Sequence, residues 1–220
     1  MKNKLIVALD VSSFKKAKKL VDRLSPCVNI FKVGSELFTC CGPQILRYIT
    51  KKRKKIFLDL KFFDIPNTIE KACLAAARHN VFMLTLHASG GREMLKKAAD
   101  AFGGNKKRPL LIGVTVLTSM KTKNVTKDVI KLVGIAKKAG LDGVVSSPKE
   151  TKQIKKTYGK KMVIVNPGVR PAWAKKDDQK RITTPKEAIQ NGADFIVVGR
   201  PITKAKDPQK AAKNILKEME

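Results

Sequence analysis

Short apolar runs alternate with amphipathic, lysine-rich segments along the chain. The apolar runs predict buried strands at 5–9, 30–33, 56–60, 82–86, 110–116, 143–145, 162–165 and 195–198. The segments between them predict helices near 13–24, 42–52, 66–79, 91–102, 127–139, 148–157, 184–191 and 207–219. Continuous apolar strands of this kind are typical of a parallel sheet that is covered by helices.

The strict alternation of strand and helix indicates an α/β fold. Eight repeats in 220 residues favour a (β/α)8 barrel, also called a TIM barrel. A doubly wound open sheet is the alternative, but no Gly-x-Gly-x-x-Gly follows the first strand. We see no linker or composition break, so we predict a single domain over 1–220. The irregular stretch 166–183 is long for a connection, and we expect it to act as a lid.

Composition narrows the class of protein. No apolar run approaches the roughly 18 residues that a membrane span needs, so we expect no membrane partner. The start of the chain has no apolar segment of the secretory type, and the four cysteines form no Cys-x-x-Cys pair. We therefore expect a cytoplasmic protein with reduced thiols.

The formal net charge of +29 has two interpretations. A basic surface of this size could bind nucleic acid. However, the lysines fall within or beside helix-like segments at spacings that suit solvated faces, and few aromatic residues are interleaved with them. We favour a lysine-rich solvated surface and expect no specific nucleic-acid partner.

Polar residues gather where the predicted strands end. They are Asp10, Lys32, Asp59, Lys61, His87, Thr118, Ser119, Arg170, Gly199 and Arg200. Barrel enzymes carry their active sites at this C-terminal face. A single residue of this kind could be a surface charge at the start of a loop. Seven of the eight predicted strands end in such residues, which indicates an active site.

The segment 59–68, Asp-Leu-Lys-Phe-Phe-Asp-Ile-Pro-Asn-Thr, is the most informative. Strand alternation predicts that Asp59 and Lys61 point to the same side, with Asp64 in the following turn. Asp10 and Lys32 would join them from neighbouring strands, which gives two cations among three carboxylates. The alternative is a buried ion-pair network that only stabilises the barrel. Such networks seldom stabilise a fold by more than the cost of burying their charges.

The end of the eighth predicted strand suggests a phosphate site. Barrels often bind phosphate in the loops after strands seven and eight, where a glycine N–H and an arginine fork can meet the oxygens. Gly199 and Arg200 fit this pattern, and Gln179 in the long connection could bridge a phosphate and the rest of a ligand.

At these residues the sequence resembles the orotidine 5′-phosphate decarboxylase family. The matching stretches are 5–10, 31–34, 59–68, 87–91, 114–119, 167–171, 177–181 and 199–203. The string Asp-x-Lys-x-x-Asp-Ile-Pro-Asn-Thr is very specific to that family, whereas the Gly-Arg pair is weak alone. The chain departs from the family pattern at Asn166, in a short segment 120–126 and in its basic charge.

The resemblance implies a function: decarboxylation of orotidine 5′-phosphate to uridine 5′-phosphate, the last step of pyrimidine nucleotide biosynthesis, by a homodimer with shared active sites and without metal or cofactor. The implied catalytic residues are Lys61 as proton donor to C6, Asp59 against the substrate carboxylate, Lys32 in the charged array and Asp64 from the partner subunit. The implied substrate-binding residues are Asp10 and Lys32 for the ribose, Thr68 from the partner, Thr118 and Gln179 for the base, and Arg170, Gly199 and Arg200 for the phosphate.

Two rival functions remain open. Hexulose-phosphate synthases and ketogulonate-phosphate decarboxylases share the barrel and an Asp-x-Lys-x-x-Asp, but they use Mg2+, for which we expect a carboxylate near position 32. Lysine at that position argues against a metal. A basic RNA-binding barrel without catalysis is the other rival, and the intact charged set argues against it.

Overall fold

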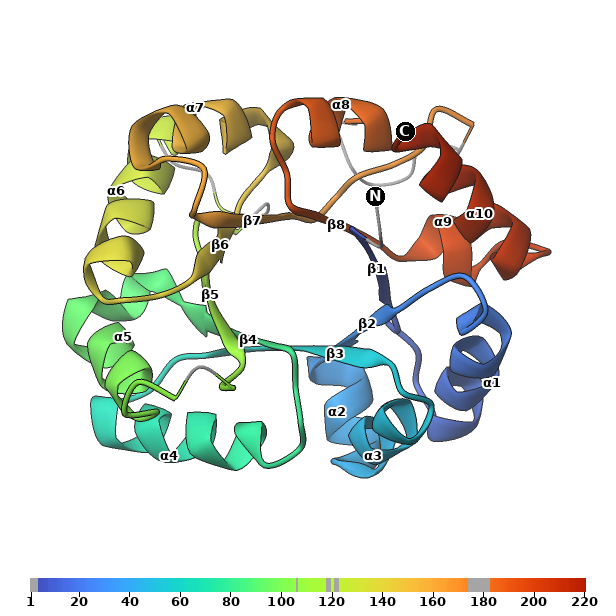
Figure 1. Cartoon of the computed structure of the whole chain (residues 1–220), viewed down its shortest axis with the longest axis horizontal. Helices are drawn as coiled ribbons and strands as arrows, with labels where there is room; N and C mark the ends of the chain where they lie inside the picture. Colours follow the sequence, from blue (N-terminus) through green and yellow to red (C-terminus); the bar gives the residue numbers. More distant parts are fainter. Residues whose placement is uncertain (1–3, 106, 118–119, 121–122, 174–182) are drawn as a thin grey trace.

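Parallel strands β1 to β8 form a closed barrel in the computed structural model, which describes residues 4–105, 107–117, 120, 123–173 and 183–220 (Figure 1). Each strand pairs with its neighbours in sequence, and β8 pairs with β1 to close the ring. The strands are β1 (Leu5–Ala8), β2 (Ile30–Gly34), β3 (Lys55–Phe62), β4 (Met83–His87), β5 (Leu110–Val114), β6 (Gly143–Val145), β7 (Val163–Asn166) and β8 (Phe195–Val198). The predicted (β/α)8 barrel is confirmed.

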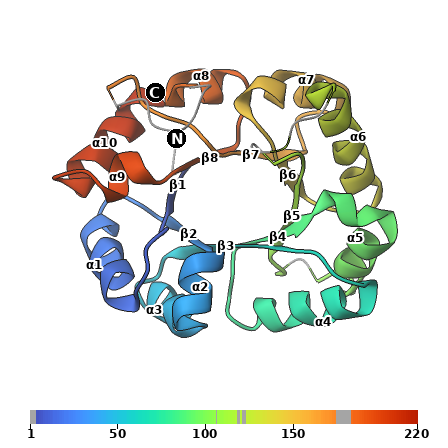
Figure 2. The same ribbon diagram turned by 180° about the vertical axis from the view of Figure 1, so that it is seen from behind.

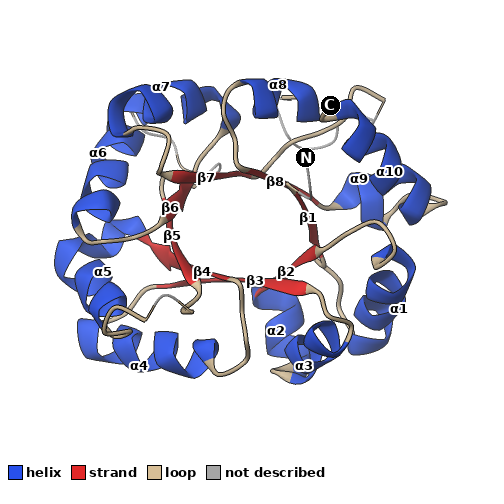
Figure 3. Ribbon diagram, viewed as in Figure 1, coloured by secondary structure: helices blue, strands red, loops and turns tan. Residues whose placement is uncertain are grey.

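The helices form a ring outside the strands, as Figures 2 and 3 show from opposite sides. The helices that the sequence predicted are α1 (Phe14–Leu24), α3 (Gln44–Lys51), α4 (Pro66–Ala77), α5 (Gly91–Asp100), α6 (Val125–Lys138), α7 (Pro148–Tyr158), α8 (Pro185–Gln190) and α10 (Pro208–Glu218). Side chains of Ser13, Asn124, Ser147, Thr184 and Asp207 cap the first turns of α1, α6, α7, α8 and α10. Across the described residues, no helix is long and apolar enough to cross a membrane.

Three short helical segments were not predicted: α2 (Ser35–Cys41), the 3-10 turn η1 (Ala88–Gly90) and α9 (Arg200–Thr203). Each follows its strand with at most one residue between them. Segments of two turns or fewer contain few positions for a 3.6-residue period, and these three continue almost directly from a strand, so hydrophobic patterning does not separate them from it.

Strand alternation sorts the core into two layers. Inward-facing side chains fill the barrel itself: Ile6, Ala8, Ile30, Phe57, Met83, Ile112, Val165 and Val197. Outward-facing side chains pack against the helices in a larger cluster. Along β1 to β4 the inward positions change from apolar to polar toward the C-terminal ends, so the barrel has an apolar floor beneath a polar mouth.

Both ends of the long connection after β7 are fixed. Asn166 belongs to β7 rather than to the loop, and it is fully buried. Its amide donates to the Ser146 carbonyl and accepts from the Thr151 hydroxyl, which ties β7 to α7. The Arg170 N–H donates to the Thr183 carbonyl at 3.0 Å. The predicted lid lies mostly in 174–182, outside the described residues.

All four cysteines are free thiols, as expected. Cys73 packs in the core, and burial raises its pKa to about 12, which makes this thiol unreactive.

Candidate active site

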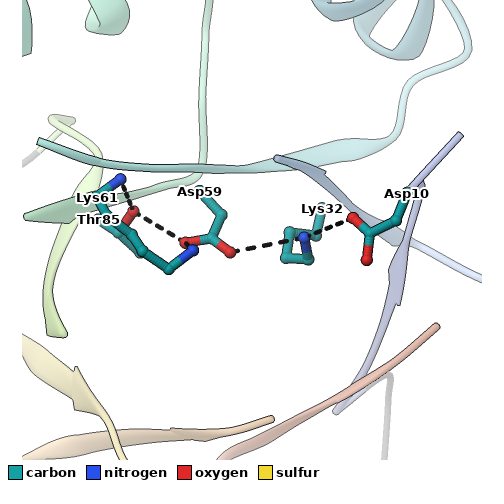
Figure 4. A network of polar contacts seen from close by, with 5 residues as sticks. All are labelled: Asp10, Lys32, Asp59, Lys61 and Thr85. Atoms are coloured by element: carbon teal, nitrogen blue, oxygen red, sulfur yellow. Dashed lines mark hydrogen bonds and ion pairs between the residues drawn. The ribbon is translucent and has the colours of Figure 1, made fainter. Parts of the chain in front are cut away.

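Four ionisable side chains form a continuous row at the C-terminal mouth of the barrel (Figure 4). Lys32 Nζ lies 2.9 Å from Asp10 Oδ1 and 3.6 Å from Asp59 Oδ2. Lys61 Nζ lies 2.9 Å from Asp59 Oδ1. The row therefore runs carboxylate, ammonium, carboxylate, ammonium across the C-terminal ends of β1, β2 and β3.

Burial differs along the row. Asp59 is only 8% exposed and the Lys32 side chain 11%, whereas the Asp10 side chain is 56% and the Lys61 side chain 39% exposed. A buried charge is costly unless it is paired and hydrogen-bonded. The inner pair is therefore held by its neighbours, while Asp10 and Lys61 keep open faces toward the mouth. A ligand that enters the mouth meets a preorganised field with one cation accessible.

Strand β3 is distorted at the point where it supplies this pair. Leu58 pairs with Leu84 and Phe62 pairs with Leu86, so β3 advances four residues where β4 advances only two. Lys61 adopts a φ of 50°, a left-handed conformation that is uncommon for residues other than glycine. Such bulges often re-aim side chains beside active sites. Asp59 and Lys61 do meet, as predicted, but not through regular strand alternation.

The Thr85 hydroxyl of β4 lies against this bulge. Thr85 Oγ1 is 3.1 Å from Asp59 Oδ1 and 2.8 Å from the Lys61 backbone N. Sequence reasoning did not identify Thr85. The sequence feature that could have identified it is that Thr85 is the single polar residue in the apolar run 82–86, at an inward position two residues before His87.

His87 ends β4 beside the charged row. Burial lowers its pKa, and the nearby Lys61 ammonium lowers it further. Its ring packs edge-on against Phe63 at 5.9 Å between centroids, and Nδ1 lies 2.6 Å from Ser89 Oγ. A neutral imidazole at neutral pH leaves the charge balance of the row unchanged.

Asp64 and Thr68 do not join the row within their own chain. Both are exposed, and the Asp64 carboxylate accepts a hydrogen bond from the Ile65 N–H at 2.7 Å. Phe63 and Ile65, on either side of Asp64, are 61% and 65% exposed. The turn after β3 thus presents a carboxylate between two exposed apolar side chains.

The predicted phosphate residues lie at the ends of β7 and β8. Gly199 precedes α9, and Arg200 is its first residue. A Cβ at Gly199 would lie 3.8 Å from Asp10 Oδ2, so the end of β8 borders the charged row. Arg170 is buried in the connection that follows β7. Thr118, Ser119 and Gln179 lie outside the described residues.

The fold and the site together define a (β/α)8-barrel enzyme with an alternating lysine–aspartate row at its C-terminal mouth. The sequence model of one family, "Orotidine 5'-phosphate decarboxylase / HUMPS family", matches residues 3–215. The chain belongs to that family.

Individual relatives agree with this assignment. An orotidine 5′-phosphate decarboxylase of Geotalea daltonii is 47% identical, over 98% of this chain and 95% of its own. That of Syntrophotalea carbinolica is 48% identical, over 99% and 95%. A crystal structure of the orotidine 5′-phosphate decarboxylase from Lactobacillus acidophilus superposes with a TM-score of 0.85 at 36% identity, covering 98% of each chain.

Proposed function

We propose that this protein decarboxylates orotidine 5′-phosphate to uridine 5′-phosphate, as a carboxy-lyase of pyrimidine nucleotide biosynthesis. The observation that carries the proposal is the row Asp10, Lys32, Asp59 and Lys61 at the barrel mouth. Relatives at 45–48% identity over nearly the whole chain carry the name of this enzyme. Cytoplasm is the proposed compartment, since four free thiols fit a reducing environment.

In the proposed mechanism Lys61 is the proton donor. The bond from C6 to the carboxylate breaks, its electron pair stays on C6, and CO2 leaves. No group of the pyrimidine ring next to C6 takes up this charge, so a nearby ammonium must stabilise it as it develops. The Lys61 ammonium then transfers a proton to C6, and solvent restores the lysine.

Asp59 and Lys32 would prepare the site for this step. An Asp59 carboxylate beside the substrate carboxylate disfavours the bound ground state relative to a transition state whose charge has moved to C6. Lys32, between Asp10 and Asp59, would hold both carboxylates in place. We propose that Asp10 and Lys32 also bind the ribose hydroxyls.

The phosphate would bind at the far side of the mouth, to the Gly199 N–H, Arg200 and Arg170. Binding energy from this remote group would lower the barrier at C6 by holding the base in place. We propose that Thr118 contacts the base and that Gln179 contacts both the base and the phosphate.

We propose that the reaction needs no metal. The family is described as containing both orotidine 5′-phosphate decarboxylases and a second group, HUMPS. Membership of the family therefore does not by itself establish which reaction the chain catalyses. A Mg2+-dependent reaction needs carboxylates that are free to bind the ion. Here the Lys32 ammonium already lies between the carboxylates of Asp10 and Asp59, at 2.9 Å and 3.6 Å.

We further propose a homodimer in which Asp64 and Thr68 complete the partner's site. Their exposure, and the exposed Phe63 and Ile65 beside Asp64, support this arrangement. A two-fold interface would bury the apolar pair and carry each Asp64 into the other subunit's mouth.

The decisive test is turnover of orotidine 5′-phosphate, followed as loss of its ultraviolet absorbance. The parent protein should be active in EDTA, and Lys61→Ala should lose at least about a thousandfold in kcat while still binding uridine 5′-phosphate. Activity that disappears in EDTA and returns with Mg2+ would favour the synthase-type rival. Turnover by Lys61→Ala within about tenfold of the parent would remove its role as proton donor.

A further inference from the structure

The Thr85 hydroxyl connects the two members of the row that would do the chemistry. Its directions are set by its partners, because an amide N–H only donates and a carboxylate only accepts. Thr85 Oγ1 therefore accepts from the Lys61 N–H at 2.8 Å and donates its single proton to Asp59 Oδ1 at 3.1 Å. The side chain is fully buried, so water does not compete for either bond.

The bulge in β3 creates the need for this hydroxyl. Between Leu58 and Phe62 the strand carries two more residues than β4 does, and Lys61 is left-handed there. The Lys61 N–H therefore has no β4 carbonyl opposite it in a regular ladder, and a partly buried N–H needs a partner. The threonine hydroxyl takes the place of that carbonyl and gives its own proton to Asp59.

We propose that Thr85 is a positioning residue: it holds the Asp59 carboxylate and the Lys61 backbone in one fixed arrangement for proton transfer. This inference rests on the proposed decarboxylation. Thr85 lies beneath the row and needs no contact with substrate. When Lys61 gives up its proton, Asp59 loses one of its two cationic partners but keeps Lys32 at Oδ2 and the neutral Thr85 donor at Oδ1, so the oxygen that faced Lys61 stays in position through the step.

Two substitutions at Thr85 separate the effect of the hydroxyl on the rate from the effect of the side-chain shape. Thr85→Val keeps the branched shape and removes the hydroxyl, while Thr85→Ser keeps the hydroxyl. Displacement of a reacting group by about 1 Å can cost on the order of a hundredfold in rate. We expect Thr85→Val to lower kcat by roughly 10- to 100-fold, with KM and the Kd of uridine 5′-phosphate within about threefold of the parent. Thr85→Ser should recover most of kcat.

Thr151→Val is the matched control. Thr151 is also fully buried, and its hydroxyl proton faces Asn166 Oδ1 at 3.0 Å and the Ser147 carbonyl at 3.3 Å. It lies on α7, outside the barrel. Loss of this hydroxyl should lower the thermal unfolding temperature by an amount similar to that in Thr85→Val but leave kcat unchanged.

The outcomes distinguish the two proposals. No turnover by the parent would overturn the decarboxylase function and this inference with it. An active parent with an equally active Thr85→Val would overturn the inference alone, as would a Thr85→Ser variant no better than Thr85→Val or an equal kcat loss in Thr151→Val. If Thr85→Val does not fold, Thr85→Cys, whose thiol is a weak donor, replaces it: a clear kcat loss supports the role and a parental kcat overturns it.

Discussion

At the scale of residues, the site depends on small neighbours as much as on charged ones. Gly34 ends β2, where it pairs with Asp59 of β3. A Cβ at this position would lie 3.0 Å from Lys32 Nζ and 3.5 Å from Asp10 Oδ1. Glycine therefore leaves the space that the Lys32 ammonium occupies between its two carboxylates.

Gly34→Ala is predicted to damage activity more than stability. The φ of Gly34 is −95°, which alanine adopts without strain, and the close atom is the mobile end of a lysine side chain. The ammonium would shift away from Asp10 and Asp59, and we expect kcat/KM to fall by roughly tenfold or more. Steady-state kinetics and a thermal melt of the same sample test this. Parental kinetics, or a loss explained wholly by unfolding, would contradict it.

At the scale of elements, the site uses the places where strands pass into helices without ordinary loops. Strand β2 leads directly into α2, and only Gly199 separates β8 from α9. Strand β3 continues through its bulge to Phe62 before the turn that carries Asp64. These junctions are short, so the position of each strand end sets the position of the side chains beside it.

Arg200→Ala tests the junction of β8 and α9 as the phosphate site. A charge-assisted hydrogen bond contributes about 1.5–3 kcal/mol, so kcat/KM should fall by roughly 10- to 100-fold, with a marked rise in KM. In the parent, added phosphite should raise turnover of a substrate that lacks its phosphate, because remote binding energy serves the chemical step, and Arg200→Ala should weaken this activation. Unchanged kinetics would mean that the phosphate binds elsewhere.

At the scale of the whole molecule, the proposed dimer makes a quantitative prediction. Lys61→Ala and Asp64→Ala should each be inactive alone. After random exchange of equal amounts, half of the dimers are mixed, and each has one complete site of two. About a quarter of parental activity should therefore return.

The exchange must be confirmed by mass spectrometry of the mixed dimer. If Asp64 served the site of its own chain, every site would hold one defect and no activity would return. Mixing two samples of Lys61→Ala provides the control, since no combination of those subunits contains the missing lysine.

The net charge of +29 also acts on the whole molecule. The proposed substrate is an anion, and a positive field raises the rate at which anions are captured. Because the Debye length falls from about 30 Å at 0.01 M to about 3 Å at 1 M salt, kcat/KM should decrease several-fold over that range while kcat changes little. A flat kcat/KM would show that the charge does not serve capture.

The sequence alone determined the eight strands and the charged residues at their ends, because these depend on short apolar runs and on one specific motif. It did not reveal Thr85, the left-handed Lys61 or the space at Gly34. Those follow from the pairing of β2, β3 and β4, where register is decided by strands distant in sequence. Only the tertiary structure brings side chains from β1 to β4 within hydrogen-bond distance, because these four strands pair in sequence order, and closure of the barrel adds the end of β8 beside β1.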